Sequence, residues 1–331
     1  MKQLINDITA QLLPCYPEDE ARSLAWWIVE EETGLSRSQI LSGCKGTTNF
    51  LKVQEFCDKN DLFFKKSHLQ AQKACRSQGN ANVASGELLG KAESESTKNL
   101  QSIVNRLLNF EPIQYIFGHT EWCGLDLKVT PATLIPRPET AELVERINKW
   151  YMVNDQMVNA LDIGTGSGCI ALALKKRHPE WQVTGIDISA EAIEIAKENA
   201  RRNNVEVDFQ IADIFSDEMT KYLNKWYMVN DQMVNIVVSN PPYIRESEKS
   251  SMRPNVLNFE PHTALFVPDS DPLRFYRRIA ELKLGTYLFF EINEALGEEM
   301  RDLLTDLGYT DILITKDIYG KARIIEGRMV G

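Results

Sequence analysis

An apolar segment that runs directly into a glycine-rich turn constrains the fold of this 331-residue chain more than any other feature. The segment is Val158 to Ile163, and the turn is Gly164-Thr165-Gly166-Ser167-Gly168. A helical pattern, Cys169 to Lys176, follows at once, so the sequence predicts a buried strand that turns directly into a helix. Open α/β sheets bind ligands in the crevice where such strands end. We therefore expect a binding site at this turn.

The alternation of strand and helix continues beyond the turn, which is typical of a parallel sheet covered on both faces. Ser189 is placed to cap the next helix, and Asn203-Asn204 to end it. Two segments separated by Tyr319-Gly320, Ile312 to Lys316 and Ala322 to Glu326, predict a closing antiparallel hairpin. Residues 141–331 are thus predicted to form a Rossmann-like α/β domain with a mostly parallel sheet. Its other expected strands are Gln182 to Ile186, Phe209 to Ile211, Ile236 to Val238 and Tyr287 to Ile292.

The first third of the chain has a helical pattern instead. Residues Glu18 to Leu41 and Gln101 to Leu108 carry apolar side chains at amphipathic spacing. Between them, Arg76 to Asn99 is rich in small and charged residues and predicts a mobile loop. We expect a small helical domain over residues 1–112.

A short region with a different period connects the two predicted domains. Leu125, Leu127 and Val129 alternate with polar residues, which indicates a half-buried strand. Residues 113–140 are therefore predicted to be bridging strands.

A twelve-residue segment occurs twice, at Asn148 to Asn159 and at Asn224 to Asn235. Both copies stand directly before an expected strand. One duplication of this length cannot form a repeat architecture, because each repeat must be a whole structural unit stacked on its neighbours.

Composition restricts the classes of partner that the protein can bind and the cell compartment in which we expect it. No apolar run is long enough for a membrane span and the first residues do not form a signal peptide, so we expect a cytoplasmic protein. The six cysteines contain no C-x-x-C pair, and neither a disulfide framework nor a metal site is indicated. The net charge of −10 disfavours a nucleic-acid partner and favours a protein partner.

The glycine spacing favours S-adenosylmethionine over a nicotinamide cofactor. A dinucleotide fingerprint would place its third glycine at Cys169, whereas this chain has it at Gly168. Asp187, at the end of the second strand, can accept both ribose hydroxyls, and Asp213 is placed to meet the adenine amino group. The predicted cofactor-binding residues are Gly164, Thr165, Gly166, Ser167, Gly168, Asp187, Ile188, Asp213, Ile214 and Asn240. A tight structural turn is the alternative reading.

A second loop, Ser239-Asn240-Pro241-Pro242-Tyr243, follows a strand about 75 residues later. An amide nitrogen is a poor nucleophile because its lone pair is delocalised. The side-chain oxygen of Asn240 and the carbonyl of Pro241 can each accept one N–H of such a group, and the prolines fix both acceptors in extended geometry. Tyr243 can lay its ring against the planar group. The alternative is a rigid loop without chemistry, but the order of the two loops favours methyl transfer to nitrogen.

At these residues the chain resembles the HemK/PrmC family, the N5-glutamine methyltransferases that modify the glutamine of the Gly-Gly-Gln motif in peptide chain release factors. The resemblance spans most of the sequence. Besides the two loops, it rests on Glu111 to Gly118, Leu134-Ile135-Pro136-Arg137-Pro138-Glu139-Thr140 and Glu260 to Leu265.

The resemblance implies a class I S-adenosylmethionine-dependent methyltransferase with a release factor as substrate. The N-terminal helices would bind that partner, and Arg137 to Thr140 would line the groove beside the cofactor, although Arg137 could equally be a structural ion-pair partner. The catalytic residues would be Asn240, Pro241 and Tyr243, and the substrate-binding residues Asn240, Pro241, Pro242, Tyr243 and Arg137.

Two other functions remain open from the sequence. One is an adenine or cytosine amino methyltransferase acting on DNA or RNA, which would need a basic surface. The other is a module that binds the cofactor without chemistry, for which an intact acceptor loop is unexpected.

Overall fold

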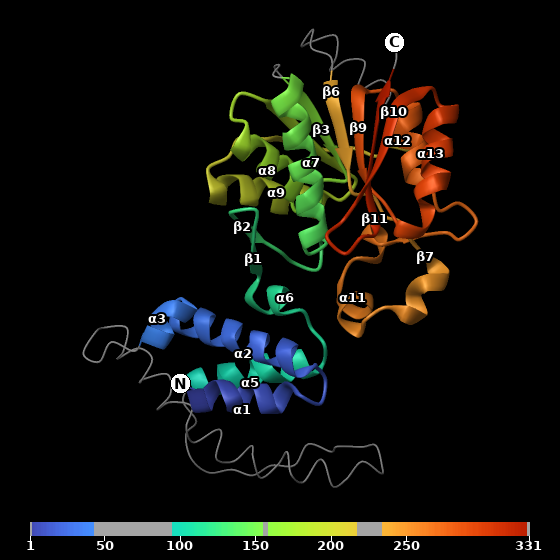
Figure 1. The fold of residues 1–331 in the computed structure, drawn as a ribbon. Helices are drawn as coiled ribbons and strands as arrows, with labels where there is room; N and C mark the ends of the chain where they lie inside the picture. Colours follow the sequence, from blue (N-terminus) through green and yellow to red (C-terminus); the bar gives the residue numbers. More distant parts are fainter. Residues whose placement is uncertain (1, 43–94, 155–157, 217–233, 330–331) are drawn as a thin grey trace. The chain divides into compact units, whose positions relative to one another are not determined.

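The computed structural model describes residues 2–42, 95–154, 158–216 and 234–329 (Figure 1). The chain divides into two compact units, Met1–Ile116 and Phe117–Gly331. No helix within these described ranges is long and apolar enough to cross a membrane.

The first unit is helical. Helix α1 packs against α2 and α5 around a fully buried core that includes Ile8, Ile28 and Val104. The Tyr16 hydroxyl donates to the Leu107 carbonyl oxygen at 2.8 Å and ties the α1–α2 connection to the end of α5. The helices of the unit are α1 (Lys2–Leu12), α2 (Glu18–Thr33), α3 (Arg37–Ser42), α5 (Glu95–Leu108) and α6 (Ile113–Phe117).

Both predicted helical segments of this unit are helical. The first of them is divided into two helices, and the second begins earlier than predicted. Gly34, at φ 62°, ends α2 and separates it from α3. The expected mobile loop lies outside the described residues up to position 94, but residues 95–99 begin α5. The apolar stripe of α5 starts at Leu100, and a helix that buries this stripe extends a turn upstream with polar residues.

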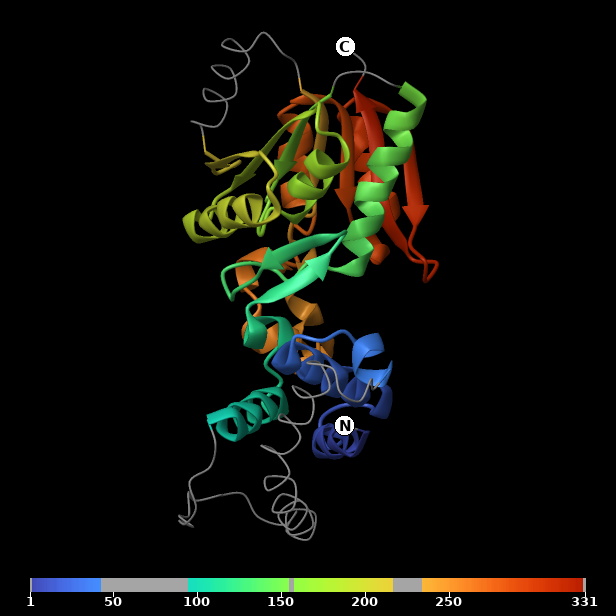
Figure 2. The same ribbon diagram turned by 90° about the vertical axis from the view of Figure 1, so that its left-hand side faces the viewer.

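The second unit is built on a seven-stranded sheet of order β10-β11-β9-β6-β3-β4-β5 (Figures 1 and 2). Strands β5, β4, β3, β6 and β9 are parallel, while β11 pairs antiparallel with both β9 and β10. The predicted sheet and its closing hairpin are therefore confirmed. The strands are β3 (Asn159–Ile163), β4 (Gln182–Asp187), β5 (Asp208–Ile211), β6 (Val234–Ser239), β9 (Gly285–Glu291), β10 (Tyr309–Lys316) and β11 (Ala322–Met329).

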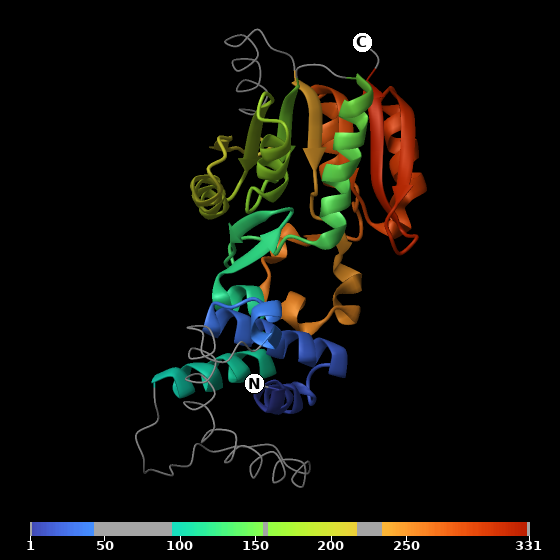
Figure 3. The same ribbon diagram turned by 60° about the vertical axis from the view of Figure 1, so that its left-hand side comes forward.

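Helices cover both faces of this sheet, with α7, α8 and α9 on one face and α12 and α13 on the other (Figure 3). Alternate strand residues point to opposite cores: Ile236 and Val238 pack on the first side, and Val237 on the second. The helices of the unit are α7 (Pro138–Asn154), α8 (Cys169–Arg177), α9 (Ala190–Asn203), α11 (Pro254–Phe259), α12 (Arg274–Glu281) and α13 (Gly297–Asp306). Strands β7 (Ile244–Arg245) and β8 (Phe266–Val267) form a separate short pair.

A hairpin of β1 (His119–Trp122) and β2 (Leu125–Lys128) packs on α9. The predicted strand at Leu125 to Val129 thus matches β2. The Asn199 side chain accepts from the Lys128 N–H at 2.6 Å and donates to the Lys128 carbonyl at 3.0 Å. Asn203 makes the same pair of bonds with the backbone of Asp126. Two helix side chains therefore satisfy backbone groups that an edge strand would otherwise expose.

The duplicated segment leads into two neighbouring strands. Its copies end at Asn159 in β3 and Asn235 in β6, which are adjacent and parallel. The Asn235 side-chain oxygen accepts from the Asn159 N–H at 2.8 Å. The rest of the second copy, residues 224–233, lies outside the described residues.

A substitution at Gly185 in β4 tests how tightly the sheet packs beneath the glycine turn. A Cβ atom at Gly185 would lie 2.6 Å from the Phe209 ring and 2.8 Å from Thr165 Oγ1. We expect Gly185→Ala to lower the free energy of unfolding by about 1–3 kcal/mol, the usual cost of overpacking a core. Denaturant titration measures it.

Gly327→Ala in β11 is the matched control, because the atoms nearest to its added Cβ lie at 3.6 Å, an ordinary contact. We expect its free energy of unfolding to stay within about 1 kcal/mol of the parent value. Equal losses in both variants would contradict the packing described here.

Candidate active site

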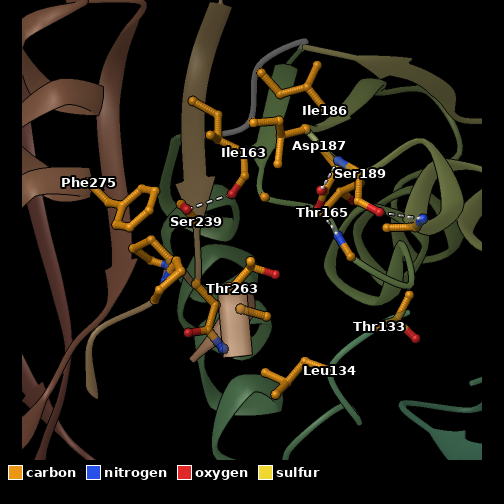
Figure 4. Close-up of a pocket in the computed structure, with 18 of the residues that line it drawn as sticks. Thr133, Leu134, Ile163, Thr165, Ile186, Asp187, Ser189, Ser239, Thr263 and Phe275 are labelled. Atoms are coloured by element: carbon orange, nitrogen blue, oxygen red, sulfur yellow. Dashed lines mark hydrogen bonds between the residues drawn. The ribbon is translucent and has the colours of Figure 1, made fainter. Parts of the chain in front are cut away.

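Parallel pairing of β3 and β6 brings the two sequence loops together. Ile163 pairs with Ser239, so Gly164 and Asn240 leave the sheet at the same level. The buried Ser239 hydroxyl donates to the Ile163 carbonyl oxygen at 2.6 Å and joins the two strand ends (Figure 4). Two loops about 75 residues apart in sequence therefore begin side by side at the carboxyl edge of the sheet.

A cavity of about 590 Å³ opens at this edge. In Figure 4, Phe275 stands on one side of it, and Thr165, Asp187 and Ser189 on the other. Every predicted site residue lines the cavity except Gly168 and Tyr243. The predicted residues that line it are Arg137, Gly164, Thr165, Gly166, Ser167, Asp187, Ile188, Asp213, Ile214, Asn240, Pro241 and Pro242.

The glycine turn adopts backbone angles that favour glycine. Gly164 has φ 73° and Gly166 has φ 55°. Beneath the turn, the fully buried Asp162 carboxylate accepts from the Thr165 hydroxyl at 2.6 Å and from the Ala171 N–H at 3.2 Å. Burial raises the pKa of Asp162 to about 7, with its hydrogen bonds acting in the opposite direction. Asp162 thus holds the turn against the start of α8.

Gly168 does not line the cavity and instead allows close packing beneath the turn. It is the N-cap of α8 at φ 80°, and an added Cβ would lie 2.9 Å from the Phe209 ring and 3.1 Å from Ala196. The third glycine therefore allows the start of α8 to approach β5 and α9 closely.

Asp187 lines the cavity from the end of β4. Its Oδ2 accepts from the Gly166 N–H and its Oδ1 from the Ser189 N–H, both at 2.9 Å. Burial raises the pKa of this carboxyl group, while the backbone hydrogen bonds oppose the rise. Each carboxylate oxygen has a further lone pair available, so both can accept hydroxyl groups of a ligand.

An apolar wall of the cavity was only partly predicted from the sequence. Ile188 and Ile214 were expected there, and the structure adds Phe215 and Phe275. The two rings meet edge to face at 5.3 Å, and the Arg274 guanidinium lies over both. Phe275 and Arg274 come from α12, far along the chain and without a motif, so no sequence signal pointed to them.

Asn240 and Tyr243 occupy different places in the acceptor loop. Asn240 lines the cavity, and its Nδ2 donates to Thr140 Oγ1 at 3.1 Å. Tyr243 does not line the cavity, and its hydroxyl donates to the buried Glu291 at 3.1 Å. Burial, followed by the Glu291 charge, raises the pKa of Tyr243. The structure does not bring the Tyr243 ring to the cavity wall.

Arg137 lies where both roles that the sequence left open, a groove residue and a structural ion-pair partner, are possible. It lines the cavity, and its guanidinium also pairs with Glu260, whose side chain is fully buried. Glu260 further accepts from the Ile135 N–H at 3.3 Å. The ion pair thus fixes the backbone segment that precedes α7 along one wall of the cavity.

These residues fit S-adenosylmethionine. Asp187 offers acceptors for a ribose diol, the apolar wall offers a surface for adenine, and the glycine backbone allows close approach of the remainder. The Ser167 hydroxyl is buried at the cavity without a protein partner among the described residues, so it is available to a polar group of the ligand.

A sheet of this order, with a glycine turn after β3 and a carboxylate at the end of β4, defines a class I S-adenosylmethionine-dependent methyltransferase. The family model of the methyltransferase small domain matches residues 140–257. The release factor glutamine methyltransferase of Bacteroides thetaiotaomicron is 47% identical over 69% of this chain and 80% of its own length. The enzymes of the same name from Flavobacterium psychrophilum and Streptococcus pneumoniae are 44% and 40% identical, over 68% and 70% of this chain and 78% and 80% of their own lengths. The chain belongs to the release factor glutamine methyltransferase family.

Asp187→Asn tests the assignment of the cofactor side. We expect the dissociation constant for S-adenosylmethionine to rise about 10- to 100-fold, the scale of losing one charge-assisted hydrogen bond. Isothermal titration calorimetry measures it. Asp208→Asn, on the exposed start of β5, is the control and should bind as the parent does. Unchanged affinity in Asp187→Asn would remove this residue from the site.

Proposed function

We propose that this protein transfers the methyl group of S-adenosylmethionine to the side-chain amide nitrogen of a glutamine, namely that of the Gly-Gly-Gln motif in peptide chain release factors. The observation that carries the proposal is the meeting of Asn240 and Pro241 with the glycine turn in one cavity. Membership of the release factor glutamine methyltransferase family supports the choice of substrate.

The chemistry required is the alignment of an unreactive nitrogen. S-adenosylmethionine, when bound, supplies an electrophilic methyl group on a positively charged sulfur. In our proposal, Asn240 Oδ1 and the Pro241 carbonyl oxygen each accept one N–H of the glutamine amide. Two fixed acceptors hold the plane of the amide and aim its nitrogen, so that positioning supplies most of the rate.

The same two oxygens remove the need for a strong base. Positive charge that develops on the nitrogen faces two preset negative dipoles, and the proton leaves to water after transfer. Pro241 and Pro242 restrict the backbone of the residue before each of them, so the acceptors are held in place before substrate arrives.

The remaining assignments concern the partner. We infer that the N-terminal helical unit binds the release factor and that Arg137 contacts the substrate beside Asn240. Because release factors act in translation, the proposed substrate places the activity in the cytoplasm.

Asn240→Ala tests the role of the acceptor loop. We expect turnover to fall about 100-fold or more, the scale of losing one preorganised polar contact, while the affinity for S-adenosylmethionine stays within a factor of about three. Asn235→Ala is the control, because Asn235 lies near the start of β6, the strand that Asn240 follows. Equal turnover in Asn240→Ala and the parent would refute the assigned role.

The substrate is tested by incubation with S-adenosylmethionine labelled on its methyl group. We expect label in a release factor, none in the same release factor with the motif glutamine replaced by alanine, and none in duplex DNA. Label in DNA alone would make the protein a nucleic-acid amino methyltransferase and overturn the proposal.

A further inference from the structure

A chain of four buried or partly buried polar side chains leads from Asn240 into the core of the second unit. Asn240 Nδ2 donates to Thr140 Oγ1 at 3.1 Å, and Thr140 Oγ1 donates to Glu291 Oε2 at 2.7 Å. The Tyr243 hydroxyl donates to the other oxygen, Glu291 Oε1, at 3.1 Å. Thr140 and Glu291 are exposed by only 3% and 1%, so the bond between them is shielded from water.

The four residues come from three separate parts of the second unit. Thr140 lies in the first turn of α7, Glu291 ends β9, and Asn240 and Tyr243 follow β6. Strands β6 and β9 are parallel neighbours, with Ser239 paired to Phe290, so Glu291 sits directly beside the start of the acceptor loop. The fold therefore fixes all four positions independently of any ligand.

The direction of these hydrogen bonds is set at Glu291. In its ionised form the Glu291 carboxylate only accepts hydrogen bonds, and each of its oxygens has a hydroxyl within hydrogen-bond distance. Burial raises the pKa of Glu291, while the Thr140 and Tyr243 hydroxyls and the positive charge of Arg323 oppose the rise and the charge of Glu139 adds to it.

The hydrogen bond from Thr140 to Glu291 determines which group of the Asn240 amide faces Thr140. A threonine hydroxyl has one hydrogen, and that hydrogen goes to Glu291, so its oxygen can only accept from Asn240. Asn240 must then turn its NH₂ group toward Thr140. Its Oδ1, which has no hydrogen-bond partner within the described part of the chain, is left for the cavity that Asn240 lines.

We propose that Thr140 and Glu291 are positioning residues that orient the Asn240 amide so that its oxygen, and not its NH₂ group, faces the substrate. In the reversed orientation, the Asn240 NH₂ group would face the NH₂ group of the substrate. Two donor groups cannot form a hydrogen bond with each other. The inference rests on the proposed function, because only an amide or amino substrate requires an acceptor at this place.

Thr140→Val removes the hydroxyl and keeps the shape of the side chain, and Thr140→Ser is the matched control that keeps the hydroxyl. With S-adenosylmethionine and release factor, we expect the turnover number of Thr140→Val to fall about 10- to 100-fold, the usual effect of losing an outer-shell partner. The KM for release factor and the affinity for S-adenosylmethionine should change less than about threefold. Turnover of Thr140→Ser should stay within about threefold of the parent. A Ser variant as slow as the Val variant, or a Val variant as fast as the parent, would overturn the inference.

Thr140→Val also leaves Glu291 Oε2 without a donor and so costs stability. Glu291→Gln tests the same inference while keeping hydrogen-bonding groups in place, because its amide no longer imposes one direction on Thr140. We expect turnover to fall about tenfold in this variant. In the Thr140→Val background, Glu291→Gln should add less than about twofold, since Glu291 acts on Asn240 only through Thr140. Additive losses, or parental turnover in Glu291→Gln, would contradict the relay.

A spectroscopic measurement separates this inference from the proposed function. In protein labelled with ¹⁵N-asparagine, the side-chain NH₂ signals of Asn240 are those missing from Asn240→Ala. We expect their hydrogens to exchange with water slowly in the parent and in Thr140→Ser, and faster in Thr140→Val. Equal exchange in all three would overturn the relay whatever the substrate. Failure to methylate release factor, with the exchange pattern as expected, would instead refute the proposed function.

Discussion

The parallel pairing of β3 with β6 is the constraint on which the site depends. It places the ends of two strands at one level, so the glycine turn and the acceptor loop leave the sheet together. The bond from Ser239 to the Ile163 carbonyl closes this junction in the core. A slip of one residue between the strands would turn each side chain to the opposite face of the sheet and separate the two loops. The meeting of the two loops is therefore a property of strand register.

Buried polar side chains then shape the loops from below. Asp162 holds the glycine turn to α8, and Asn199 ties Ser167 to the β1–β2 hairpin through backbone bonds at 2.9–3.0 Å. Asp187 fixes the turn from the next strand. Each group would be costly to bury without its partners, so the backbone that meets the ligand is fixed by the same bonds that stabilise the core. The relay through Thr140 and Glu291 extends this arrangement to the acceptor loop.

The sequence predicts the mostly parallel sheet, its closing hairpin and the two loops that line the cavity, because apolar periodicity and glycine turns are local signals. The sequence predicts less about cavity residues whose position depends on distant parts of the chain. Phe275 reaches the cavity from a helix without a motif, and Tyr243 belongs to a motif but turns inward toward Glu291. The start of α5 at Glu95 was also missed, since its first turn is polar and carries no apolar period. Such features depend on tertiary neighbours that no local window contains.

The most direct test of the account is a crystal structure with S-adenosylhomocysteine and a peptide that contains Gly-Gly-Gln. We expect the glutamine side-chain nitrogen to lie about 2.7–3.2 Å from both Asn240 Oδ1 and the Pro241 carbonyl oxygen, the range of an N–H···O hydrogen bond. We also expect the nitrogen to face the cofactor sulfur. A glutamine bound elsewhere, or an Asn240 oxygen turned away from the substrate nitrogen, would contradict the account.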